Sequence, residues 1–191
     1  MAEARAGTAG KGTYRVLAMI AILLALAVAV LAAGQLHLLD TAYARLFGPP
    51  DLGPVAFERL IRRASGNDAL ACPPGECGSA KVDIRPPTYA AAANELRQRV
   101  RRHFAGQGAE LIAADDAELH DRFVARTPLL RFPDTVDVQI FPADAGHASV
   151  ALYSRSQLGI YDFGTNLRRL RQLFEALGPG VASASLMRWR G

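Results

Sequence analysis

Residues 135–153, TVDVQIFPADAGHASVALY, decide the fold of this chain. Val136, Val138 and Ile140 alternate with polar neighbours, so they lie on one face of a predicted β-strand. Residues 142–146 have the composition of a turn, and residues 148–153 form a second alternating run. Two such runs joined by a short turn predict an antiparallel β-hairpin.

The segments around the hairpin predict the layers of the domain. Strands joined by short turns pair antiparallel, because parallel pairing needs a long crossover. The fold class is therefore α+β: an N-terminal transmembrane helix is followed by a small two-layer domain of mostly antiparallel sheet with helices on one face. Apart from the hairpin, the predicted elements are helices over residues 54–64, 88–104 and 162–177, with Pro54 first in one helix and Thr88 as an N-cap, and short strands over residues 110–113 and 119–125.

Residues 16–33, VLAMIAILLALAVAVLAA, form an apolar run with no charged or polar side chain. A helix of this length comes close to crossing the roughly 30 Å hydrocarbon core of a bilayer. Arg5, Lys11 and Arg15 precede the run, and basic residues favour the cytoplasmic side, so we expect the N-terminus inside and the domain exported. A cleaved signal peptide is the alternative, although its apolar core is usually only about 7–15 residues long.

The breaker-rich sequence GPPDLGP, residues 48–54, separates the anchor from the domain. We expect the protein in a bacterial inner membrane, with a cytoplasmic N-terminus and a periplasmic domain. The expected segments are a disordered cytoplasmic stub (1–15), a transmembrane anchor (16–36), a linker (37–53), the exported α+β domain (54–178) and a C-terminal tail (179–191).

The charge of the chain does not favour nucleic-acid binding. Three of the 22 basic residues and one of the 18 acidic residues precede the apolar run, so the exported part carries only +2. Nucleic-acid binding needs a concentrated basic face. The basic clusters at residues 97–102 and 168–171 are interpreted as solvated helix faces. Modest affinity for anionic lipid head groups remains an option for a domain held at a membrane.

Cys72 and Cys77 flank the sequence Pro-Pro-Gly-Glu, which suits a type II turn. The turn brings the two sulfurs together, and an exported domain lies in an oxidising compartment, so we predict a disulfide. Two free thiols are the alternative. A zinc site needs about four nitrogen or sulfur ligands, and the histidines are scattered, so we expect no metal and no cofactor.

Residues 154–166, SRSQLGIYDFGTN, join the hairpin to the last helix. An arginine beside hydroxyl groups and a helix N-terminus is typical of an anion pocket. In the structural alternative, Asp162 caps the helix, Arg155 pairs with Asp134 across the hairpin and the serines bond local backbone. The candidate ligand-binding residues are Arg131, Asp134, Ser154, Arg155, Ser156, Asp162 and Asn166.

The hairpin also limits the chemistry of this junction. If Phe141 pairs near His147, Asp134 lies within a residue or two of Ser154. Asp134 and Asp137 are three residues apart in a strand, so they face opposite sides and form no carboxylate dyad. The sequence contains no G-x-S-x-G elbow, H-E-x-x-H pair or phosphate-binding glycine loop, and we assign no catalytic residue.

Three stretches occur together in the exported part: NDALACPPG (67–75), RFPDTVDV (131–138) and SRSQLGIYDFGTN (154–166). In this order they resemble the bacterial and plastid family called domain of unknown function 1499, over about residues 67–177. The resemblance implies a membrane-anchored or exported protein. It implies no catalytic residue, because the family has no established activity.

These observations favour a non-enzymatic binding or assembly module at the periplasmic surface of the membrane. The expected partners are the membrane itself, an envelope protein, or an anionic lipid or small anion. The alternative is an envelope enzyme, or a domain that binds a small anion or lipid at the junction around Arg155 and Asp134.

Overall fold

The computed structural model describes residues 7–35 and 37–181. Residues 1–6 of the predicted stub and residues 182–191 of the predicted tail lie outside this range. The helices are α1 (Gly7–Gln35), α2 (Leu38–Phe47), the short 3-10 helix η1 (Phe57–Arg59), α3 (Ala93–Gly106) and α4 (Thr165–Leu177), and the strands are β1 (Asp68–Ala71), β2 (Glu110–Asp115), β3 (His120–Arg126), β4 (Pro133–Pro142) and β5 (Ala148–Ser156).

The five strands form one antiparallel sheet in the order β1-β5-β4-β3-β2. The predicted hairpin is its centre, where β4 pairs with β5 over nine residue pairs. Phe141 lies opposite Ser149, and Asp134 lies opposite Ser156. The α+β fold class is therefore confirmed, with a register two residues away from the expected pairing of Phe141 near His147.

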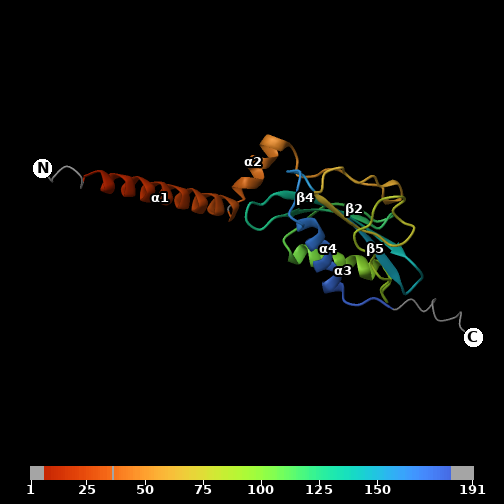
Figure 1. The fold of residues 1–191 in the computed structure, drawn as a ribbon. Helices are drawn as coiled ribbons and strands as arrows, with labels where there is room; N and C mark the ends of the chain where they lie inside the picture. Colours follow the sequence, from red (N-terminus) through yellow and green to blue (C-terminus); the bar gives the residue numbers. More distant parts are fainter. Residues whose placement is uncertain (1–6, 36, 182–191) are drawn as a thin grey trace, which may run out of the picture.

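Helices α3 and α4 lie together against one side of the sheet, which we call the helical face (Figure 1). The alternating residues Val136, Val138 and Ile140 point into this core, as predicted, and all are at most 2% exposed. Leu96 and Val100 of α3 pack against them. Removing this apolar surface from water is the main driving force for closing the two layers.

The opposite side, which we call the coil face, is covered by the chain between α2 and α3 (Figure 1). Phe57 and Leu60 are buried there beside Leu70 of β1 and the predicted disulfide, which is formed between Cys72 and Cys77. The expected helix over residues 54–64 is wrong. Phe57 and Leu60 have helical spacing, but one 3-10 turn places both against the sheet, and the chain then runs extended.

Two predicted helix starts are also wrong. Helix α3 begins at Ala93 rather than Thr88, because Tyr89 is extended and forms a bridge with Ala148 of β5. Helix α4 begins at Thr165 rather than Asp162, after Gly164 with a φ of 72°. A left-handed glycine at this point ends the preceding turn and sets the direction of the helix.

Helix α1 extends away from the domain (Figure 1). Its segment from Gly12 to Gly34 is apolar, exposed and long enough to cross a membrane, as an anchor or as a signal sequence. The region interpreted as a linker contains α2, which is packed against the domain: Tyr43 donates a hydrogen bond to the backbone oxygen of Leu130 at 2.8 Å.

The basic cluster on α3 is only partly a solvated face. Arg97 is 3% exposed, and its guanidinium donates to both carboxylate oxygens of Asp121, at 3.1 and 2.7 Å. Arg101 donates to the same two oxygens at 2.8 and 2.7 Å. Burial acts to raise the pKa of Asp121, but the hydrogen bonds from Arg101 and Arg97 outweigh it and hold the pKa below its usual value.

We predict that Asp121 makes the domain acid-sensitive. Its stabilisation is complete above the unfolded pKa of about 4 and is lost as pH falls through the lower folded value. Asp121→Asn should lower the free energy of unfolding at neutral pH by about 3 kcal/mol, because it leaves buried charge uncompensated. It should also flatten the fall in stability below about pH 4.

Urea denaturation of the full chain in a neutral detergent, repeated across this pH range, measures both effects. Asp116→Asn is the matched control: Asp116 pairs with the same Arg97 but is 87% exposed, so its loss should change stability little. Equal effects of the two substitutions would contradict the assignment.

Candidate functional site

Asn166, in the first turn of α4, is fully buried at the junction between β5 and the helix. Its Oδ1 accepts a hydrogen bond from the hydroxyl of Ser154. Its Nδ2 donates to the backbone oxygen of Asn67 at 3.0 Å, to Ser156 Oγ at 2.9 Å and to Asp162 Oδ2 at 2.8 Å. Four predicted site residues are therefore brought together, in a network that fastens α4 to the sheet.

Asp162 has the role of a helix cap, although it lies two residues before the N-cap position. Its carboxylate accepts the backbone N–H groups of Gly164 and Asn166, at 2.9 and 2.8 Å. These are N–H groups that a helix start leaves without an intrahelical partner. The carboxylate therefore stabilises the turn into α4.

Asp134 joins the same side of the sheet through a residue that the sequence interpretation missed. Arg169 of α4 donates to Asp134 Oδ2 at 2.6 Å and to Ser154 Oγ at 2.7 Å. The other oxygen of Asp134, Oδ1, is buried and has no hydrogen-bond partner among the described residues. Arg169 lies three positions after Asn166, so helical periodicity places both on one face, and this spacing was the available signal.

Arg155 lies on the coil face, away from this network. It donates to Asp137 Oδ2 at 2.6 Å and to the backbone oxygen of Gly53 at 2.7 Å. His120 Nε2 lies 3.2 Å from the other oxygen of Asp137. The expected pairing of Arg155 with Asp134 is wrong, because the strand alternation turns these two side chains to opposite faces.

Arg131 lies in the loop between β3 and β4 and connects the domain to α2. Its guanidinium binds both carboxylate oxygens of Asp40, at 2.9 and 2.7 Å, and also contacts His37. Burial acts to raise the pKa of Asp40, but the hydrogen bonds from Arg131 and His37 keep the pKa below its usual value. The seven predicted residues thus occupy three separate surroundings, and their role in ligand binding stays a prediction.

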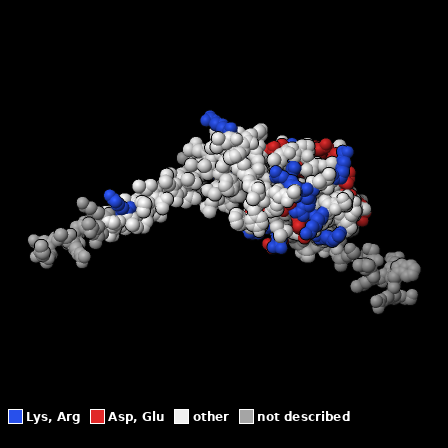
Figure 2. All heavy atoms as spheres, turned by 45° about the horizontal axis from the view of Figure 1, so that its top comes forward, with Lys and Arg blue, Asp and Glu red and all other residues white. Residues whose placement is uncertain are grey.

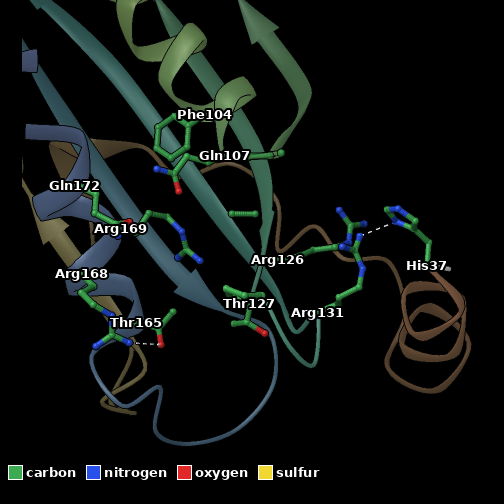
Figure 3. Close-up of a pocket in the computed structure, with 14 residues that line it drawn as sticks. His37, Phe104, Gln107, Arg126, Thr127, Arg131, Thr165, Arg168, Arg169 and Gln172 are labelled. Carbon is green, nitrogen blue, oxygen red and sulfur yellow. Dashed lines mark hydrogen bonds between the residues drawn. The ribbon is translucent and has the colours of Figure 1, made fainter. Parts of the chain in front are cut away.

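A cavity of about 550 Å³ lies where the end of α3, the end of β3, the start of α4 and the turn between α1 and α2 meet; we call it the arginine cavity. Four guanidinium groups line it, from Arg126, Arg131, Arg168 and Arg169. Figure 3 shows Arg126 and Arg131 near His37 on one side, and Arg168 and Arg169 reaching from α4 on the other. No Asp or Glu is among the described residues that line it.

A second cavity, of about 570 Å³, adjoins the first; we call it the apolar cavity. Two loops form most of it, residues 127–132 between β3 and β4 and residues 157–164 between β5 and α4. Leucine and aromatic side chains dominate its lining, and its polar residues include the buried Asp134 and Ser156 and the partly buried Asp162.

Metal-binding geometry is not found in residues 7–35 and 37–181: no three His, Cys, Asp or Glu side chains gather there as a metal site. Residues 58–177 match the family model described as "Protein of unknown function (DUF1499)". None of the curated proteins matches the chain.

We predict that Asn166→Ala destabilises the domain by about 3 kcal/mol, because it leaves several buried polar groups without partners. Arg171→Ala, at an exposed position of the same helix, should change stability by no more than about 0.5 kcal/mol. Thermal or urea unfolding of the full chain distinguishes the two. If both variants matched the parent protein, the junction network would not hold α4 in place.

Proposed function

Because the chain belongs to the DUF1499 family, whose function is unknown, we propose its role from the geometry: a membrane-tethered, non-enzymatic binding domain that holds an anionic group in the arginine cavity. One observation carries the proposal. Four arginines from three segments of the chain converge on one cavity beside the end of α1. Guanidinium groups bind phosphate and carboxylate groups with paired, charge-assisted hydrogen bonds.

The charges around the cavity leave room for an anion. Asp40 pairs with Arg131 and Arg126, and Asp134 pairs with Arg169. Arg168 has no carboxylate partner among the described residues, and its guanidinium donates to Thr165 Oγ1 at 3.2 Å. It is therefore the cation most available to a ligand.

The position of the cavity supports a role at a membrane surface. His37 and Arg131 belong to its wall. His37 follows Gly34, the end of the apolar segment, by three residues, and Arg131 forms an ion pair with Asp40 of α2. If α1 crosses the inner membrane with its N-terminus in the cytoplasm, the cavity lies at the periplasmic surface. Anionic lipid head groups are then the most concentrated anions nearby.

The serine environment supports binding rather than catalysis. The hydroxyls of Ser154 and Ser156 are engaged with Asn166 on the helical face. The buried pair of His120 and Asp137 lies on the coil face, so it cannot serve either serine as a base.

We predict that glycerol phosphate binds to the full chain in an uncharged detergent, and that Arg168→Ala weakens the affinity about tenfold through loss of a charge-assisted hydrogen bond. Isothermal titration calorimetry at fixed salt measures this. Arg171→Ala is the matched control, because it removes the same charge from the same helix outside the cavity. Absence of binding by the parent protein, or an equal loss in both variants, would overturn the proposal.

A further inference from the structure

We propose that the ligand is a single-chain anionic amphiphile with a hydroxyl group between its head and its tail, as in a lysophospholipid. Its anionic head binds in the arginine cavity and its acyl chain lies in the apolar cavity; the head-group part rests on the function proposed above. The connection between the two cavities supports this assignment.

The two cavities share a wall. Thr127, Pro128 and Thr165 line both of them. Arg169 faces the arginine cavity and Asp134 faces the apolar cavity, and the 2.6 Å ion pair between these two side chains forms part of the boundary. A ligand that occupies both cavities therefore changes from charged to apolar surroundings within the length of one molecule.

The apolar cavity has the surface expected of a chain-binding site. Leu129 and Phe163 are 66% and 81% exposed at its edge, and Leu130, Phe132 and Leu158 also line it. Its volume of about 570 Å³ is in the range of sites for small organic ligands. Leaving such large apolar side chains in water is unfavourable, and an acyl chain would cover them.

Asp134 indicates what lies between the head and the chain. Its side chain is buried, its Oδ1 has no partner among the described residues, and it lines the apolar cavity beside Ser156. A buried carboxylate oxygen without a donor is costly. A ligand hydroxyl at the boundary of the cavities would donate to this oxygen, and a single-chain glycerophospholipid has one at that place.

The acyl chain of the ligand would come from the bilayer next to α1. A Cβ on Gly34 would lie 3.2 Å from the backbone oxygen of Leu129, and Tyr43 bonds the backbone oxygen of Leu130. The wall of the apolar cavity therefore touches the end of the anchor. On the face shown in Figure 2, α1 and the part of the molecule that adjoins it are mostly white, and most of the charged residues lie farther along the domain.

In this arrangement the apolar cavity holds the acyl chain, and the arginine cavity and Asp134 select the ligand. A chain that leaves the bilayer for the apolar cavity moves between two apolar surroundings, so its transfer is close to neutral. Selectivity for the amphiphile then comes from the arginines and from the hydrogen bond to Asp134. A zwitterionic diacyl lipid has a phosphate for the arginines, but it carries a cation beside that phosphate and has no free hydroxyl for Asp134.

The test uses the full chain in phosphatidylcholine vesicles that contain a small fraction of acyl glycerol phosphate with a photoreactive group at the chain end. We expect crosslinks to residues 127–132 and 156–163. Leu158→Asp should reduce them at least fivefold, because it places a charge on the cavity wall. Ile160→Asp is the matched control, since Ile160 lies on the same loop, is 85% exposed and is not part of the lining.

Binding of glycerol phosphate, measured on the same variants, separates the two proposals. Unchanged affinity of Leu158→Asp for glycerol phosphate shows that the head-group site is intact. If Leu158→Asp does not fold, Leu130→Asp on the facing wall of the apolar cavity takes its place. Crosslinks confined to α1 and α2, with glycerol phosphate still bound, would overturn the acyl-chain assignment alone. If no lipid is crosslinked and a bifunctional amine or carboxyl crosslinker, added in a parallel sample, joins two protein chains, the apolar cavity is covered by a second copy and the acyl-chain assignment is also overturned.

The hydroxyl is tested with unlabelled competitors. Lauroyl glycerol phosphate and dodecyl phosphate both have a phosphate and a similar chain, but only the first has a hydroxyl between them. We expect the first to displace the photoreactive lipid at a concentration at least fivefold lower. Equal displacement would overturn the role of Asp134.

Discussion

The pairing of β4 with β5 sets the positions of the side chains on both faces of the sheet. With Asp134 opposite Ser156, strand alternation turns Asp134, Ser154 and Ser156 toward α4 and turns Arg155 and Asp137 toward the coil face. A shift of β5 by one residue would turn Arg155 toward α4 and the two serines toward the coil face. The register thus decides that Asn166 and Arg169 find buried polar partners, and the position of α4 then shapes both cavities.

Much of this arrangement was predictable, because the information is local. Alternation in residues 135–153 indicates the hairpin, Leu170 and Leu173 mark the buried stripe of α4, and the spacing of Cys72 and Cys77 fits a closed turn. Where an element depends on partners that are distant in the sequence, the local hydrophobic pattern did not predict it. β1 has only four residues, and pairing with β5 rather than its own sequence makes it a strand.

The candidate site was less predictable than the fold for the same reason. Asp134 and Arg155 face opposite sides of the hairpin in both the expected and the observed register, because a shift of two residues leaves each side chain on its own face. Arg126, Arg168 and Arg169 belong to β3 and α4, so only the packing of the helix on the sheet brings them together. Arg168 was interpreted as part of a solvated face, and it is indeed exposed, but it faces a cavity that local sequence does not reveal.

Both proposals require that the end of the domain beside α1 holds an anionic amphiphile. The most direct test is native mass spectrometry of the full chain, extracted from membranes in a mild uncharged detergent. We expect a protein population carrying the added mass of one single-chain anionic lipid, which is lost in Arg168→Ala and kept in Arg171→Ala. A bare protein mass, or an added mass equally retained by both variants, would contradict it.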